Sequence, residues 1–276
     1  MIVAQTPTQL REALRDRPRP LGVVLTMGAL HAGHLALIAR ARAECATVGA
    51  SIFVNPLQFG PNEDFARYPR ALPDDLAAFD RAGVDVAFTP GVDTMYPAGF
   101  ATSVDPGPVG ERFEGALRPG HFRGVATVCT KLFSLFGAER VYFGAKDAQQ
   151  VAALRRVVAD LALPVELIVV PTVRESDGLA LSSRNAYFSA EERSAAPALH
   201  RALDAIVHAV REGEDNRESV LARGRGQLVD GTREAYLDLV DPLTFEAVEP
   251  AASRALAIGS VWVGATRILD NEAVRT

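Results

Sequence analysis

Short apolar runs alternate with segments of helical periodicity from residue 21 to residue 170, and this alternation restricts the fold more than any other feature. Apolar runs of strand length occur at 21–25, 50–54, 84–88, 141–143 and 165–170. Between them, apolar residues recur at helical spacing over 34–45, 74–82, 124–136 and 147–161. Such alternation predicts a Rossmann-like α/β fold, with a parallel sheet and helices on both of its faces.

The pattern changes at Ser189, where a capping-box sequence predicts a long helix through Ala209. A second helix is predicted over 218–228, followed by strand-like runs at 236–240, 255–258 and 261–269. Helices followed by strands indicate a smaller α+β domain. We therefore predict two domains, residues 1–172 and residues 173–276. The segment 90–122 is rich in Gly and Pro and lacks periodicity, which predicts a long loop or lid.

Composition favours an ordinary soluble globular protein over several other classes of protein. The chain is 48% hydrophobic and 23% charged, which is typical of globular domains. Its net charge of -5 gives no bulk attraction to nucleic acid or to an anionic membrane. Residues 1–5 do not resemble a signal peptide, and no apolar run reaches the length of a membrane span. Cys45 and Cys129 lie in apolar contexts that predict buried free thiols, so we expect a cytoplasmic protein.

Four unusual polar clusters begin where predicted strands end. They occupy residues 26–34, 55–59, 144–150 and 171–185. The carboxyl ends of parallel strands lie at one edge of the sheet, and open α/β sheets bind ligands at that edge. The sequence therefore predicts a ligand site built from these clusters.

The cluster Thr26–His34 joins a predicted strand to a predicted helix through a glycine-containing turn. A helix N-terminus offers N–H groups and a positive dipole end to a phosphate, and His31 and His34 could each donate a further hydrogen bond. The cluster is not a P-loop, because His34 and Leu35 stand where that motif has lysine and serine or threonine. A metal site shared by the two histidines, and two ordinary surface histidines, remain alternatives at this point.

The remaining clusters contain residues suited to phosphate and to a polar acid. Lys146 precedes a helix and could hold a polyphosphate, or could be an ordinary solvated lysine. Asp147 could cap that helix or bind a ligand. Ser182–Arg184 offers two hydroxyls and a guanidinium for phosphate, or forms a plain polar loop. Gln58 and Gln150 are neutral side chains suited to a substrate with hydroxyl and carboxylate groups.

Other polar residues have weaker functional interpretations. Asp74 and Asp75 could approach a metal through water, but we favour a role at a helix N-terminus. The sequence Arg-Pro-Gly-His-Phe-Arg at 118–123 predicts a basic loop over an anion. His200 and His208 lie on the predicted C-terminal helix and are expected to be structural or exposed.

Taken together, the motifs resemble the family of pantoate–β-alanine ligases over nearly the whole chain. The resemblance rests on residues 26–34, 51–59, 68–70, 118–122, 143–150 and 174–185. The His-x-Gly-His element alone marks only the wider nucleotidyltransferase superfamily. Its combination with Asn-Pro-x-Gln-Phe and Lys-Asp-x-Gln-Gln is far more specific to this family.

The resemblance implies an enzyme that works in two steps. The carboxylate of pantoate attacks the α-phosphorus of Mg²⁺-bound ATP and gives pantoyl adenylate and pyrophosphate. The amine of β-alanine then attacks the acyl carbon and releases AMP. A homodimer is also implied.

The resemblance also implies roles for individual residues. His31 and His34 would contact the phosphates of ATP, and His34 matches the position usually called the proton donor. With Lys146 and Arg184 they form the implied catalytic set. Gln58 and Gln150 would hold pantoate, and Gln58 would also lie near β-alanine. The implied ATP-binding residues are Met27, Gly28, Ala29, Leu30, His31, Ala32, Gly33, His34, Gly144, Ala145, Lys146, Asp147, Val173, Leu181, Ser182, Ser183 and Arg184.

Three positions depart from the family pattern. Leu25 stands where proline is common, Leu181 replaces a frequent methionine, and Ala145 stands where glutamate is common. The alanine puts in doubt a side-chain contact at this position but no backbone contact.

Other functions fit the residues less well. An adenylyltransferase for a phosphate-bearing acceptor would favour Arg or Lys where the neutral Gln58 and Gln150 stand. A non-catalytic nucleotide sensor would have no need for the acceptor residues Asn55, Gln58 and Gln150. A function on transfer RNA would require a basic surface, which the net charge does not support.

Overall fold

The computed structural model describes residues 1–61, 63–250 and 254–274. The contacts within the chain divide it into two units. One comprises Met1–Gly144 and Ala153–Val170, and the other comprises Ala145–Ala152 and Pro171–Thr276. The short segment after Gly144 thus groups with the C-terminal part, which no sequence pattern indicates. The boundary predicted between residues 172 and 173 stays a prediction.

The first unit is built on a six-stranded sheet in which every pair of neighbouring strands is parallel, in the order β1-β4-β3-β2-β5-β6. The strands are β1 (Ile2–Ala4), β2 (Leu21–Thr26), β3 (Thr47–Ile52), β4 (Val86–Phe88), β5 (Arg140–Gly144) and β6 (Glu166–Val170). The two central strands, β2 and β3, are almost entirely buried, which explains why apolar residues and glycine predominate in them.

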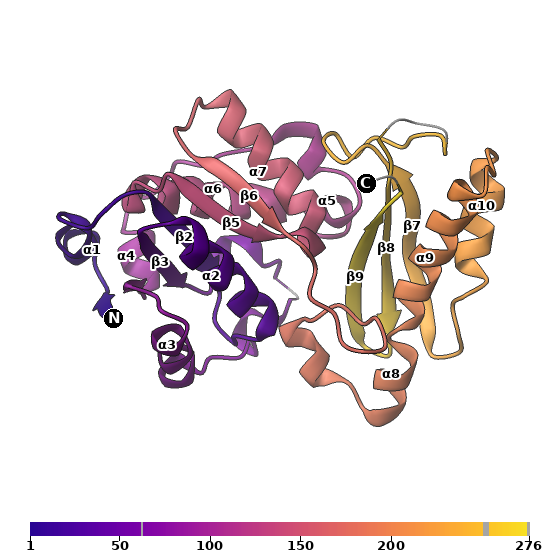
Figure 1. Cartoon of the computed structure of the whole chain (residues 1–276), viewed down its shortest axis with the longest axis horizontal. Coiled ribbons are helices and arrows are strands. Elements are labelled where there is room, and N and C mark those ends of the chain that lie inside the picture. The colour runs from indigo at the N-terminus through magenta and orange to yellow at the C-terminus, as the bar shows by residue number, and fades with distance from the viewer. Residues whose placement is uncertain (62, 251–253, 275–276) are drawn as a thin grey trace. The chain divides into compact units, whose positions relative to one another are not determined.

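Helices cover both faces of this sheet (Figure 1). On one face, α2 (Ala32–Glu44) and α3 (Leu72–Arg81) pack against the sheet, with Ile38 and Phe79 in one core cluster with Val24. On the other face lie α1 (Pro7–Leu14) and α6 (His121–Phe136). A Cβ at Gly49 of β3 would lie 2.8 Å from the ring of Phe136 on α6, so glycine at this position lets α6 pack closely against the sheet. The predicted α/β fold class is confirmed.

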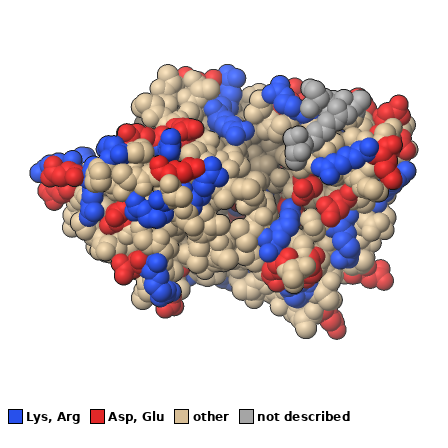
Figure 2. All heavy atoms as spheres, viewed as in Figure 1, with Lys and Arg blue, Asp and Glu red and all other residues tan. Residues whose placement is uncertain are grey.

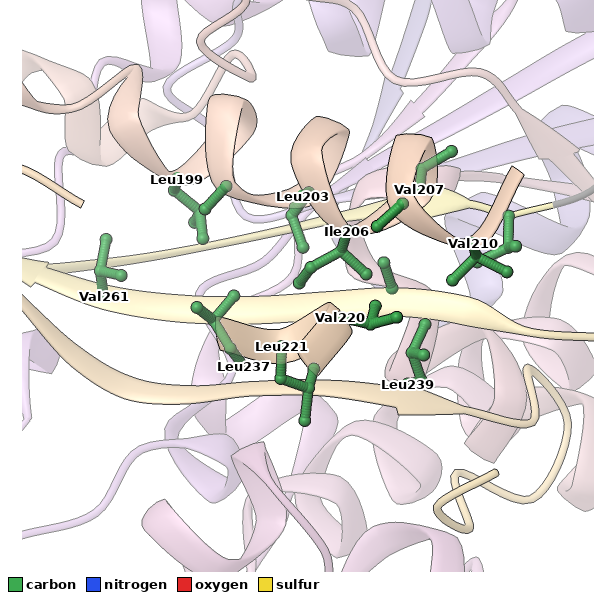
Figure 3. Close-up of a cluster of buried hydrophobic side chains, with 14 of the residues drawn as sticks. Leu199, Leu203, Ile206, Val207, Val210, Val220, Leu221, Leu237, Leu239 and Val261 are labelled. Carbon is green, nitrogen blue, oxygen red and sulfur yellow. The ribbon is translucent and has the colours of Figure 1, made fainter. Parts of the chain in front are cut away.

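The second unit contains a three-stranded antiparallel sheet of β7 (Thr232–Val240), β8 (Leu256–Val263) and β9 (Thr266–Ala273). Three helices accompany it: α8 (Ala190–Ala195), α9 (Ala198–Arg211) and α10 (Arg217–Arg225). Figure 3 shows Leu203, Ile206 and Val210 of α9 directed toward the strands, where Leu237 and Leu239 meet them. This apolar stripe at helical spacing accounts for the predicted α+β domain.

Several predicted elements have different boundaries in the structure. The single helix expected over 189–209 is two helices, because Pro197 lies between α8 and α9 and has no N–H to continue the first. The strands expected at 255–258 and 261–269 are β8 and β9, which meet at a turn around Gly264 (φ +57). The long predicted loop at 90–122 contains two one-turn helices, α4 (Val92–Met95) and α5 (Glu114–Leu117).

On the face shown in Figure 2, Lys and Arg side chains are interspersed with Asp and Glu. None of the helices in the described ranges has both the length and the apolar character needed to cross a membrane. Cys45 and Cys129 are buried free thiols, as predicted, and burial raises the pKa of Cys129 to about 12.

Candidate functional site

The turn between β2 and α2 is shaped by a carboxylate that comes from α3. Gly28 (φ +85) and Ala29 (φ 51) adopt left-handed backbone conformations. The buried carboxylate of Asp75 accepts hydrogen bonds from the N–H groups of Ala29 at 3.0 Å and Leu30 at 2.9 Å. A Cβ at residue 28 would lie 2.8 Å from Asp75 Oδ2, so the turn requires glycine. Asp75 does lie in the first turn of α3, as predicted, but its contact with this turn was not predicted.

We expect Asp75→Asn to destabilise the fold by about 1–3 kcal/mol, the usual cost of leaving a buried hydrogen-bonding group without its partner. The new amide nitrogen would face one of the two N–H donors and could not accept its hydrogen bond. Urea denaturation measures the change. Asp74→Asn, at the exposed neighbouring position, is the matched control and should leave stability within about 0.5 kcal/mol of the wild-type value. Equal stability of the two variants would show that Asp75 does not hold the turn.

His31 and His34 cap the N-terminus of α2 through their Nδ1 atoms. His31 Nδ1 accepts the N–H of Gly33 at 3.1 Å, and His34 Nδ1 accepts the backbone N–H of His31 at 3.3 Å. A neutral imidazole that accepts at Nδ1 carries its proton on Nε2. Both rings therefore have Nε2–H donors at the positive end of a helix, with ring centroids 4.2 Å apart. This arrangement suits an anion with several oxygens, such as a polyphosphate.

A metal shared by the two histidines is disfavoured by the same geometry, because both Nδ1 atoms are used for capping. In the described ranges, one group of three potential ligands lies close together, and it consists of His200, Asp204 and Glu272. Neither His31 nor His34 belongs to that group.

Gln58 lies on the 3₁₀ helix η1 (Pro56–Gln58), just after β3, and its side chain reaches the turn after β2. Its Nε2 lies 3.2 Å from the Sδ of Met27, and its Oε1 accepts a hydrogen bond from Asn55 at 3.0 Å. The Asn55 Nδ2 also donates to the carbonyl of Gly124 on α6 at 3.1 Å. The structure thus brings together two of the four predicted clusters, at the carboxyl ends of β2 and β3.

The cluster that follows β5 is held through its backbone. It forms the 3₁₀ helix η4 (Ala145–Asp147), and Asn271 of β9 donates hydrogen bonds to the carbonyls of Ala145 at 3.0 Å and Lys146 at 2.8 Å. Lys146 Nζ lies 3.2 Å from the carboxylate of Asp147. Gln150 is half-buried on α7 (Ala148–Asp160). These backbone contacts do not depend on a glutamate at position 145.

The segment after β6 turns back on itself and is held by Arg174. Its guanidinium donates hydrogen bonds to Asp270 at 3.1 Å and to Glu272 at 3.2 Å. Burial opposes the charge on this guanidinium, but the hydrogen bonds and charge of Asp270 outweigh burial and raise the pKa of Arg174. The turn places Val173 next to Leu181, whose N–H donates to the Val173 carbonyl at 3.0 Å.

The predicted phosphate clamp follows directly. Ser182 caps the short 3₁₀ helix η5 (Ser183–Tyr187), since its Oγ accepts the N–H of Arg184 at 3.3 Å. Ser182, Ser183 and Arg184 therefore lie in one tight turn. Their contact with a phosphate stays a prediction.

Comparisons with known proteins identify the family. The family model described as pantoate–β-alanine ligase matches residues 2–273. The chain belongs to the pantoate–β-alanine ligase family. It is 52% identical to the pantothenate synthetase of Acidobacterium capsulatum, over 97% of this chain and 95% of that protein.

Solved structures agree with this assignment. The crystal structure of pantothenate synthetase from Thermus thermophilus superposes with a TM-score of 0.96 at 49% identity, covering 100% of both chains. The ligase from Francisella tularensis, complexed with β,γ ATP and β-alanine, superposes with a TM-score of 0.80 at 31% identity. That match covers 100% of this chain and 98% of the Francisella chain.

The prediction of a basic loop at residues 118–123 needs correction. The segment 118–123, whose last three residues begin α6, is not a free basic loop over an anion, because its guanidiniums are paired with carboxylates. Arg118 Nε donates to Glu63 at 2.8 Å, and Arg123 pairs with Asp105 at 2.7 Å. Burial and the charge of Arg118 lower the pKa of His121 to about 4, so this histidine is neutral at pH 7.

The C-terminal histidines have the structural or exposed positions that the sequence predicts. His208 is exposed and lies 3.2 Å from Glu212 on the same helix surface. His200 pairs with Asp204 at 3.4 Å, and its ring fills the space beside Gly178, where a Cβ would lie 2.0 Å from Cδ2. Because Arg174 already neutralises Glu272, we interpret the His200 group as structural.

Sequence reasoning missed the contacts through which Asp75, Tyr96 and Asn271 hold the candidate segments. Asp75 holds the turn after β2, Asn271 holds the segment after β5, and the hydroxyl of Tyr96 donates to Asn55 at 2.7 Å. Each contact joins residues far apart in the chain, so no local pattern signals it.

Proposed function

We propose that this chain condenses pantoate with β-alanine at the expense of ATP, through pantoyl adenylate. A pantoate carboxylate oxygen bonds to the α-phosphorus of ATP as the bond to the β-phosphate breaks and pyrophosphate leaves. The amine of β-alanine then bonds to the acyl carbon, loses a proton to solvent, and displaces AMP. The observation that carries the proposal is the turn Thr26–His34, with two Nε2–H donors at a helix N-terminus. The Francisella relative, complexed with β,γ ATP and β-alanine, supports this choice of substrates.

The first step requires alignment and charge stabilisation more than it requires proton transfer. The nucleophile is a carboxylate, which is already ionised at pH 7, so no general base is needed. Negative charge grows on the oxygen that bridges the α- and β-phosphates, and positioned donors lower the barrier there. His31, His34, Lys146 and Arg184 supply these donors in our proposal.

The substrate-binding residues are proposed from the same motifs. ATP contacts the backbone and side chains of 27–34, 144–147, Val173 and 181–184, and pantoate contacts Gln58 and Gln150. Gln58 and Gln150 are neutral, which suits a hydroxy acid better than a phosphate-bearing acceptor.

Mg²⁺ is proposed to enter with ATP. Magnesium retains several waters and binds substrate phosphates with only one or two carboxylates, and no group of three potential ligands is found at Thr26–His34 in the described part of the chain. The Asp75 carboxylate accepts two backbone hydrogen bonds, so the exposed Asp74 is the better candidate to face a magnesium-bound water. When bound, the ion would neutralise charge on the phosphates. A homodimeric, cytoplasmic enzyme with domains 1–172 and 173–276 completes the proposal.

We expect pantoate-dependent exchange of labelled pyrophosphate into ATP in the absence of β-alanine. Reversal of the first step is possible only if an adenylate forms before the amine arrives. The measurement is label incorporation with pantoate, compared with reactions that lack pantoate or contain a phosphorylated hydroxy acid instead. Exchange that appears only when β-alanine is added would contradict the adenylate mechanism. Exchange with the phosphorylated hydroxy acid but not with pantoate would favour an adenylyltransferase for a phosphate-bearing acceptor.

A further inference from the structure

The amide of Asn55 has a fixed orientation, because two backbone groups define which of its ends donates. Its Oδ1 accepts the N–H of Leu57 at 3.2 Å, and its Nδ2 donates to the carbonyl of Gly124 at 3.1 Å. A backbone N–H can only donate and a carbonyl can only accept. The residue is 1% exposed, so water does not compete for these contacts. Asn55 therefore presents a donor, and not an acceptor, to Gln58.

Tyr96 holds this orientation from the other side. Its hydroxyl lies 2.7 Å from Asn55 Oδ1 and must donate to it, because Oδ1 has no proton. Burial, with a smaller effect of Cys129, raises the pKa of the Tyr96 phenol, so the phenol stays protonated at neutral pH. The ring packs against Phe53 and Phe100, with centroids 5.9 Å and 4.9 Å away.

The fixed Asn55 determines what Gln58 can offer a substrate. Asn55 Nδ2 donates to Gln58 Oε1 at 3.0 Å, so the Nε2 end of Gln58 lies toward Met27 in the turn after β2. An amide nitrogen donates to a carboxylate or hydroxyl oxygen and does not accept a hydrogen bond from an ammonium group. This end of Gln58 therefore suits pantoate and not the amine of β-alanine.

The main chain of Gln58 is fixed by a second set of contacts. Its carbonyl accepts the Nδ1–H of His121 at 2.8 Å and a weaker hydrogen bond from Arg118 at 3.3 Å. His121 Nε2 in turn accepts from Arg118 at 3.1 Å, which fixes the tautomer of the ring. The Arg118 guanidinium is itself held by both oxygens of Glu63.

We propose that Tyr96 and His121 are positioning residues that fix Gln58 as a hydrogen-bond donor to an oxygen of pantoate. Tyr96 acts on the side chain through Asn55, and His121 acts on the main-chain carbonyl. The inference deepens the proposed function and rests on it, because it assigns a polarity and a substrate to Gln58.

The test compares Michaelis constants in the pyrophosphate exchange assay. Tyr96→Phe keeps the ring and removes the hydroxyl, and we expect it to raise the KM for pantoate about 3- to 10-fold, as expected for loss of one hydrogen bond. His121→Ala should have a similar effect. The KM for ATP should stay within about twofold of the wild-type value in both variants, a selectivity that general loss of structure would not produce.

A rescue variant separates positioning from folding. His121→Asn places an amide N–H near the position of Nδ1, so it should return the KM for pantoate to within about threefold of the wild-type value. Arg123→Ala is the matched control, because this arginine lies two residues further along α6 and makes an exposed ion pair with Asp105. It should leave all Michaelis constants unchanged.

The outcomes distinguish this inference from the proposed function. Wild-type protein without pantoate-dependent exchange would overturn the function itself. Active wild-type protein with an unchanged KM for pantoate in Tyr96→Phe would overturn only the positioning role. Equal increases in the KM values for ATP and pantoate would do the same. If His121→Ala does not fold, His121→Asn decides: a KM for pantoate raised more than threefold in the folded protein would contradict donation from His121.

Discussion

Replacing His34 with alanine should lower kcat by about 10²–10⁴, the range for loss of a positioned donor or transition-state stabiliser. The expected cause is loss of the Nε2–H at the N-terminus of α2, where charge develops between the α- and β-phosphates. Steady-state kinetics of AMP release with saturating ATP, pantoate and β-alanine measures the effect. Thermal denaturation should show a fold that remains intact, because His34 is only partly buried.

A second substitution separates proton transfer from hydrogen bonding. His34→Gln keeps an N–H near the position of Nε2 but cannot act as an acid at neutral pH. If donation alone stabilises the transition state, the glutamine variant should retain at least about tenfold more activity than the alanine variant. If both variants are equally inactive, His34 has to transfer a proton.

The matched control for this histidine lies on α9. His208 is 73% exposed and pairs with Glu212 at the surface, so His208→Ala should retain kcat within about twofold of the wild-type value. A loss below fivefold in His34→Ala would place His34 among such bystanders and contradict the proposed role.

The fold was predictable wherever the information is local. Alternating apolar runs identify β2, β3, β4, β5 and β6, and the spacing of apolar residues identifies α2, α6 and α9. The three-residue strand β1 was not predicted, because it is too short to give a pattern. The errors are also local in origin. The apolar periodicity of a helix continues on both sides of Pro197, so the periodicity alone predicts one helix. The helix breaks there because proline has no N–H to donate. β8 ends at Val263, before the turn at Gly264 and inside the segment 261–269 that the sequence predicted as one strand.

Local sequence patterns nominate the candidate site residues, and their phosphate contacts stay predictions. His31 and His34 cap their own helix, and Ser182 caps the helix that follows it, which the motifs did not predict. The contacts that hold these segments come from elsewhere. Asp75 reaches the turn after β2 from 46 residues away, and Asn271 reaches Ala145 from 126 residues away. Such contacts depend on how the strands and helices pack, and a local sequence pattern does not predict that packing.

Replacing Gly124 with alanine should lower kcat/KM for pantoate about 10²-fold, because it moves the segment that carries Gln58. A Cβ at residue 124 would lie 2.2 Å from the carbonyl oxygen of Leu57 and 2.7 Å from the backbone nitrogen of Gln58. These are backbone atoms, which cannot rotate away as a side chain could. Either η1 or α6 must therefore shift, and a displacement of about 1 Å at a reacting centre is enough for such a loss.

A shift of α6 relative to η1 would disturb Gln58 through two hydrogen bonds. The Gly124 carbonyl accepts a hydrogen bond from Asn55, and His121, one turn earlier on α6, donates to the Gln58 carbonyl. Gly124→Ala should therefore affect the KM for pantoate more than the KM for ATP, and overpacking should reduce stability by about 1–3 kcal/mol. Gly91→Ala is the matched control, because a Cβ at residue 91 would meet no atom within 4 Å and the φ of this residue is -76°. A wild-type kcat/KM for pantoate in Gly124→Ala would contradict this prediction. It would show that Gln58 is positioned by its contacts with Asn55 and Tyr96 and not by the close packing of α6 on η1.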